Sequence, residues 1–253
     1  MDDLVVFFKN GKIKLLIAFL VFVVLVSLFY GFAIKQRHEA EMVMSQYVQN
    51  SQSTLVIDAG HGGADGGASS PSGTLESEIN LQIAQKIDAL TGLYGIPSEM
   101  TRTSEDIDYP SDAATIRAKK VADTKARVEL INSVNNAVLV SIHQNIYASA
   151  SASGPQVLYA GTTGSAEFAQ IMQDTLAAAL NPGKVRAPTH VSSDIYIMNH
   201  LDCTAILVEC GFLSNAGDEA NLKDSGYQVK IAAAVLSAYI ASQDIFSGGN
   251  NEA

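Results

Sequence analysis

The chain is poor in the residues that build cysteine-based metal sites. It contains two cysteines, Cys203 and Cys210, and no CxxC pair, so a bound zinc ion would have to be held by histidine and carboxylate side chains. If the segment between the cysteines is extended, its seven residue steps span about 20 Å, which is far beyond disulfide reach. We therefore expect two free, packed thiols.

Basic residues are also scarce. Lysine and arginine number 16 against 26 aspartates and glutamates, which gives a formal net charge of −10. Residues 1–40 contribute +2, so residues 41–253 carry −12. A region this acidic is a poor candidate for binding nucleic acid, whose phosphates require a basic face.

Charge is absent altogether from one long apolar run, Leu15–Ile34, whose twenty residues are enough to cross a bilayer as a helix. Three lysines within residues 9–14 precede it, and the positive-inside rule places residues 1–14 in the cytoplasm and the rest of the chain outside it. A cleavable signal peptide is the alternative, because Gly31-Phe-Ala33 resembles a cleavage site. The run is longer than a usual signal sequence, which favours an uncleaved anchor.

A polar linker, residues 35–52, follows the apolar run. From Thr54 onward, strand-like and helix-like patterns alternate, which predicts an α/β domain over residues 53–245 with a single open, largely parallel twisted sheet flanked by helices. Residues 246–253 are expected to form a flexible tail. Helices are predicted near Ile79–Leu90 and at Ala113–Asn132, Ala166–Leu180 and Tyr227–Ala241.

Three short apolar runs lead to residues that can bind or serve a metal. These residues are His61, His143 and Glu209. Uninterrupted apolar runs are typical of strands buried in a parallel sheet, and ligands of such sheets gather beyond the carboxyl ends of the strands. Glu76 begins the first predicted helix, where the helix dipole favours a charged carboxylate.

Two histidines and one carboxylate form a catalytic rather than a structural zinc shell, because the fourth position stays open for water. Zinc would lower the pKa of that water toward about 7 and polarise a substrate carbonyl. Glu209 follows four apolar residues, and a carboxylate buried there is costly unless a metal-bound water or a basic group faces it. Glu209 is therefore the candidate for moving protons during hydrolysis.

Four motifs together resemble the zinc-dependent N-acetylmuramoyl-L-alanine amidases of bacterial cell-wall metabolism. They are Asp58-Ala-Gly-His-Gly-Gly63, Glu76-Ser-Glu-Ile-Asn80, Ser141-Ile-His-Gln-Asn145 and Leu207-Val-Glu-Cys-Gly-Phe-Leu-Ser-Asn215. The resemblance spans Thr54–Ala241 and implies hydrolysis of the amide between N-acetylmuramic acid and L-alanine in peptidoglycan. It also implies that His61, Glu76 and His143 bind Zn²⁺ and that Glu209 is the catalytic glutamate.

Within that family, Thr101-Arg-Thr103, the segment Ser111–Arg127 and the single membrane helix are most similar to the germination-specific amidases of endospore formers. This similarity implies a role in the spore cortex that leads to muramic lactam, with a membrane-anchored, extracytoplasmic domain in the forespore envelope. No wall-binding repeat is recognisable, so targeting would depend on the anchor or on an activating protein partner.

Several alternatives remain open at this point. Glu78 could replace Glu76 as the ligand, although the spacing to Asn80 favours Glu76. Arg102, Arg117 and Arg127 could bind the stem-peptide carboxylates or form salt bridges on helix surfaces, and salt bridges are the safer expectation. Ile195–Met198 is expected to be a strand, and Tyr196 could line a cleft or the core. The domain could also be a non-catalytic peptidoglycan-binding or activator module, or a zinc peptidase of different specificity.

Overall fold

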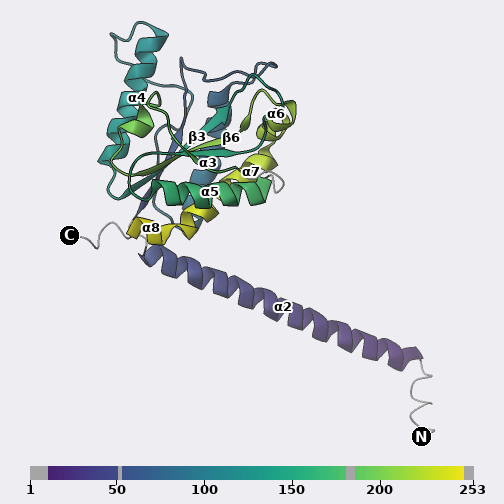
Figure 1. Ribbon diagram of the computed structural model, residues 1–253. Coiled ribbons are helices and arrows are strands. Elements are labelled where there is room, and N and C mark those ends of the chain that lie inside the picture. Colours follow the sequence, from purple (N-terminus) through teal and green to yellow (C-terminus); the bar gives the residue numbers. More distant parts are fainter. Residues whose placement is uncertain (1–10, 51–52, 181–185, 248–253) are drawn as a thin grey trace. The chain divides into compact units, whose positions relative to one another are not determined.

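The computed structural model describes residues 11–50, 53–180 and 186–247 (Figure 1). The chain divides into two compact units, with the boundary between Asn50 and Ser51. Most of the predicted cytoplasmic segment, residues 1–14, lies outside the described residues, as does the greater part of the predicted tail.

The described part of the first unit, residues 11–50, forms the helix α2 (Gly11–Asn50), so residues 35–50 of the predicted linker are helical. Within it, Ile13–Glu39 is long and apolar enough to cross a bilayer, with a mean hydropathy of 2.8 in its most apolar window. A membrane anchor and an N-terminal signal sequence both meet this criterion.

The second unit is built on a six-stranded sheet in the order β2-β1-β3-β6-β4-β5. The strands are β1 (Thr54–Ala59), β2 (Ser98–Met100), β3 (Ala137–Asn145), β4 (Gln156–Tyr159), β5 (Thr189–His190) and β6 (Thr204–Phe212). β2, β1, β3 and β6 are mutually parallel, whereas β4 pairs antiparallel with β6. The expected open, largely parallel sheet is confirmed, with an edge pair that runs the opposite way.

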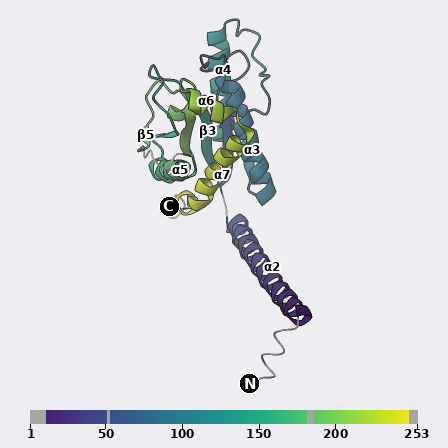
Figure 2. The ribbon, with the colours of Figure 1, turned by 90° about the vertical axis from the view of Figure 1, so that its right-hand side faces the viewer.

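Helices cover both faces of this sheet (Figures 1 and 2). α3, α5 and α7 pack together, whereas α4 contacts β3 and a short 3₁₀ helix, η1. The bounds are α3 (Glu76–Tyr94), α4 (Ile116–Ser133), α5 (Ser165–Leu180), η1 (Ile197–Asn199), α6 (Ala216–Lys223), α7 (Ser225–Ala241) and α8 (Gln243–Ser247). The four helices expected from apolar periodicity are therefore present, and α8 takes in the first two residues of the predicted tail.

A core beneath α4 explains why this helix docks despite being polar along most of its length. Ile131 of α4 joins Val56, Leu139 and Leu207, one from each central strand, and Met198 of η1 completes this part of the cluster. All of these side chains are at least 97% buried. Burial of apolar surface provides most of the free energy for such docking, and it holds α4 and η1 over one face of the sheet.

Two local predictions concern the cysteines and the segment Ile195–Met198. Both thiols are free, with Cys210 buried on β6 and Cys203 half-buried just before it, as expected. The expected strand at Ile195–Met198 is wrong, because the segment turns into η1 instead. Asn199 stabilises that turn by donating its side-chain N–H groups to the carbonyls of Ser192 and Ile195.

Candidate metal centre and active site

The register of the parallel strands brings two of the candidate residues together. β3 pairs with β6 so that His143 lies directly beside Glu209. β1 lies on the other side of β3 with Ala59 beside Ile142, and it ends two residues before His61. The carboxyl ends of the three apolar strands therefore lie side by side, as the sequence predicts.

Glu76, the first residue of α3, completes a compact group with the two histidines. Its Oε1 lies 2.9 Å from Nδ1 of His143, and its Oε2 lies 3.4 Å from Nε2 of His61. The ligand atoms of these three residues all lie within 4.8 Å of one another. One imidazole nitrogen thus faces each carboxylate oxygen, which is the donor set expected around a single ion.

Two glycines make this approach sterically feasible. A Cβ atom on Gly60 would overlap the imidazole ring of His143. Gly67 has a φ of +68°, and its Cβ would lie 2.6 Å from Oε2 of Glu76 and 2.8 Å from Cδ2 of His61. Only glycine provides both the left-handed backbone and the missing volume at position 67.

Glu78 lies on a different face of α3 from Glu76. The side chain of Glu76 is 5% exposed and accepts hydrogen bonds from the backbone N–H groups of Ala68 and Gln144. Glu78 is exposed and belongs to a separate pocket with Lys223. Of the two glutamates, Glu76 alone is placed to contact the histidines.

The pKa of His61 is raised by its carboxylate neighbours. Burial would lower this pKa, but Nδ1 of His61 lies 2.8 Å from Oδ2 of Asp65, and Glu76 lies on the opposite side of the ring. Together the two carboxylates raise the pKa of His61 to about 9. Burial likewise opposes the charged form of Glu76, yet the hydrogen bonds with His143 and His61 hold its pKa well below its usual range.

Glu209, unlike Glu76, has an environment that disfavours its charged form. Its Oε2 is inaccessible to solvent and has no hydrogen-bond partner among the described residues. Burial raises the pKa of Glu209 to about 7 despite the nearby imidazole of His143. A carboxyl group with a pKa near neutrality can both accept and donate a proton at physiological pH.

Two buried arginines hold the loop that carries His61. Arg127 donates to the carbonyl oxygens of Ala59 and His61, each at 2.6 Å, and forms an ion pair with Asp58 at 2.9 Å. Arg102 donates to the carbonyl of Ala59 at 2.8 Å and to that of Gly60 at 3.2 Å. Arg102 also forms an ion pair with Glu105, and Arg127 forms one with Asp123 on its own helix. Both arginines are nevertheless buried, and both stabilise the loop backbone.

Asp58 anchors this network beneath the loop. Burial would raise its pKa, but the ion pair with Arg127 and hydrogen bonds from Ser141 and Thr101 lower the pKa of Asp58 to about 2. Ser141 lies beside Asp58 in the register of β1 and β3, and its hydroxyl is 2.5 Å from Oδ2. The strand pairing therefore supplies a partner for this buried charge.

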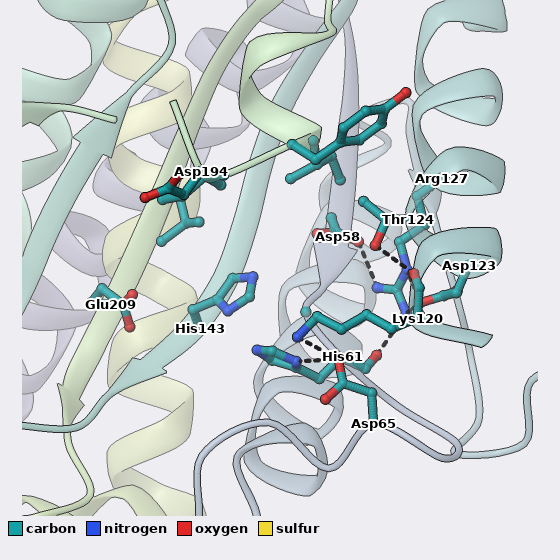
Figure 3. Close-up of a pocket in the computed structure, with 15 residues that line it drawn as sticks. Asp58, His61, Asp65, Lys120, Asp123, Thr124, Arg127, His143, Asp194 and Glu209 are labelled. Carbon is teal, nitrogen blue, oxygen red and sulfur yellow. Dashed lines mark hydrogen bonds and ion pairs between the residues drawn. The ribbon is translucent and has the colours of Figure 1, made fainter. Parts of the chain in front are cut away.

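A pocket of about 310 Å³ opens over these residues (Figure 3). His61, His143 and Glu209 line one part of it, and α4 and the segment that leads into η1 line the rest. The other lining residues are Asp58, Gly60, Asp65, Lys120, Asp123, Thr124, Arg127, Asp194, Ile195, Tyr196, Ile197 and Leu207. Tyr196 thus belongs to the cleft rather than to the core.

Asp65 was not identified from the sequence, although it contacts His61. It lies four residues after His61 in the same glycine-rich loop, and that spacing was the available signal. The remaining histidines of the second unit, His190 and His200, lie outside the pocket lining, and their Nδ1 atoms are close to backbone carbonyls.

Comparisons with known proteins agree with this arrangement. Residues 55–241 match the family described as N-acetylmuramoyl-L-alanine amidase. The germination-specific N-acetylmuramoyl-L-alanine amidase of Bacillus subtilis is 32% identical over 182 residues, which cover 72% of this chain and 76% of that protein. The amidase LytC of the same organism is 31% identical over 185 residues, and the chain spans only 34% of its length.

A solved structure shares both the fold and the level of identity. The CwlD amidase of Clostridioides difficile, determined in complex with the GerS lipoprotein, is 32% identical. The match covers 77% of this chain and all of that one, with a TM-score of 0.72. The chain belongs to the N-acetylmuramoyl-L-alanine amidase family, and it is an enzyme with peptidoglycan amidase activity.

Proposed function

We propose that this amidase depends on zinc, is anchored in the membrane by α2 and acts on spore cortex peptidoglycan. The observation that carries the zinc assignment is the convergence of His61, Glu76 and His143 beside Glu209. The proposed division of the chain is residues 1–14 in the cytoplasm, 15–34 in the membrane, 35–52 as a linker, 53–245 as the catalytic domain and 246–253 as a tail.

The donor set fits zinc better than it fits calcium or magnesium. Two imidazole nitrogens and one carboxylate suit zinc, whereas calcium and magnesium prefer shells made of oxygen. Asp65 holds Nδ1 of His61, so Nε2 of that ring faces the cluster. A hydrogen bond donated by a metal-binding histidine to a carboxylate is a common way to orient the ring.

The residues around the site have distinct roles in hydrolysis. Zinc, when bound, would polarise the amide carbonyl and lower the pKa of a water molecule. Glu209 takes the proton from the attacking water and passes it to the nitrogen of L-alanine, because it lies beside His143 and lines the pocket. Arg127 and Arg102 hold the loop of His61 in place during these steps.

Similarity to two relatives supports the finer assignments. The Bacillus subtilis relative is named germination-specific, which favours a role in the spore cortex and an extracytoplasmic location at the forespore envelope. The Clostridioides difficile relative was solved with a lipoprotein, which favours a protein partner for this chain as well. The length of the apolar helix favours an anchor over a cleaved signal sequence.

The purified protein is incubated with zinc and with either cortex or vegetative peptidoglycan, and the products are analysed by mass spectrometry. This assay tests both the reaction and the substrate. The proposal expects free stem peptides, released preferentially from cortex. Binding without release would indicate a peptidoglycan-binding or activator module. New amino termini on fragments that keep the lactyl–alanine bond would indicate a peptidase of different specificity.

Metal analysis of two neighbouring variants tests the ligand assignment. Glu76→Ala should lose bound zinc, because it removes the carboxylate between the two histidines. Glu78→Ala is the matched control and should retain zinc, because its side chain is exposed. The reverse pattern would refute the assignment.

A further inference from the structure

The pocket over the candidate metal centre has an acidic lining, although the peptides of the substrate carry free carboxyl groups. Its lining includes five carboxylates, those of Asp58, Asp65, Asp123, Asp194 and Glu209. The surrounding region adds to this field, because residues 41–253 carry a net charge of −12. An anionic substrate would be repelled unless a cation in the pocket offers it hydrogen-bond donors.

Arg127 cannot offer those donors. Its Nε donates to Asp123, Nη1 donates to Asp58 and to the carbonyl of Ala59, and Nη2 contacts Asp123 and the carbonyl of His61. The side chain is only 6% exposed. Each guanidinium nitrogen is therefore already engaged with the protein.

Lys120 is the one lysine in the pocket lining, and it differs from Arg127 in its exposure and in its hydrogen bonding. Its side chain is 53% exposed, and its Nζ lies 2.9 Å from Oδ2 of Asp65. Figure 3 shows the side chain reaching from α4 toward His61, with its end beside the imidazole ring. An ammonium group has three donors, so one contact with Asp65 leaves donors for a ligand.

The helical periodicity of α4 places Lys120 on the face that lines the pocket. Lys120, Asp123, Thr124 and Arg127 follow the three- and four-residue spacing of one helix face, and all four line the pocket. Lys125 is exposed and lies outside the pocket lining. It is therefore a matched control for charge on the same helix.

We propose that Lys120 binds a carboxylate of the stem peptide and thereby makes the enzyme select peptides with a free carboxyl group near the scissile amide. This inference rests on the proposed function. In the substrate of an N-acetylmuramoyl-L-alanine amidase, the lactyl carboxyl is consumed in the amide and the sugar hydroxyls are neutral. Negative charge close to the reacting bond therefore comes from the stem peptide. The free carboxyl group nearest to that bond is the α-carboxyl of the second stem residue.

Equilibrium binding to the full chain in detergent, loaded with zinc and carrying Glu209→Gln to prevent turnover, tests this role. The probes are two muropeptides that differ only in whether the α-carboxyl of the second stem residue is free or amidated. A charge-assisted hydrogen bond should give the free acid a preference of roughly ten- to a hundredfold. Adding Lys120→Met should reduce this preference to within about twofold, whereas Lys120→Arg and Lys125→Met should retain it.

Two results would overturn the inference. One is equal binding of the acid and the amide by the protein that retains Lys120. The other is a Lys120→Met protein that loses zinc and binds both probes more weakly by the same factor, because Lys120 would then act only through Asp65 and His61. Cleavage of the same muropeptides by the chain with Glu209 intact is scored separately, so failure of the proposed function leaves the preference measurable.

Discussion

The raised pKa of Glu209 leads to a quantitative prediction for the metal-stripped catalytic domain. Folding raises this pKa from its usual value of 4.5 to about 7, because burial disfavours the charged carboxylate. The folded protein therefore retains a proton that the unfolded chain releases. Its contribution to stability is complete below pH 4.5 and is lost as the pH rises to 7.

The size of the loss follows from the two pKa values. Between pH 5 and pH 8.5, a single carboxyl group shifted in this way costs about 2.5 kcal/mol of unfolding free energy. Glu209→Gln keeps the shape of the side chain and removes its titration. As the pH rises from 5 to 8.5, the unfolding free energy of the variant should therefore increase by about 2.5 kcal/mol relative to that of the unmodified domain.

Urea denaturation of residues 53–247, treated with a chelator and followed by circular dichroism at pH 5 and pH 8.5, measures this difference. Groups such as His61 titrate in both proteins, so their contributions cancel to first order. Added zinc should shrink the difference, because a nearby cation lowers the pKa of Glu209. A pH dependence equal in the two proteins within about 0.5 kcal/mol would refute the account of Glu209 as a buried, partnerless carboxyl group.

Two further substitutions test the loop that carries His61. Arg127→Met should destabilise the domain by about 3–5 kcal/mol in denaturation, because it leaves Asp58 buried without its counterion. Arg117→Met, on the exposed surface of the same helix, should change stability by no more than about 0.5 kcal/mol, and equal losses would contradict the assigned role of Arg127. Gly67→Ala should weaken zinc binding by about tenfold or more in a chelator competition, because the added Cβ displaces Glu76. Gly73 also has a positive φ, +90°, but open space around it, so Gly73→Ala should retain zinc affinity. A matching loss there would show that backbone strain alone is responsible.

The sequence predicted the elements of the fold well where the pattern is local. The apolar runs before His61, His143 and Glu209 are strands, and the periodic segment after Glu76 is α3. Ile195–Met198 was misassigned, because a short apolar run is compatible with several conformations. The side-chain bonds of Asn199 to the carbonyls of residues 192 and 195 favour the turn, and periodicity carries no signal of such bonds.

The roles of the arginines were beyond reach of the sequence. Arg127 is separated by 66–69 residues from Asp58 and from the two carbonyl groups that it contacts. Nothing in the residues around it distinguishes an exposed helix arginine from one that enters the core. Its burial depends on α4 docking over β3, which brings the guanidinium to the end of β1.

By itself, the sequence determined the apolar span, the order of strands and helices along the chain, and the residues able to bind a metal, because these depend on residue type and local spacing. The tertiary structure alone decided that His143 lies beside Glu209 and that Lys120 reaches the pocket while Lys125 does not. It also decided that one oxygen of Glu209 is buried with no hydrogen-bond partner in the part of the chain that the structure describes. Strand register and helix docking fix these relations through contacts between distant segments, and no local pattern encodes them.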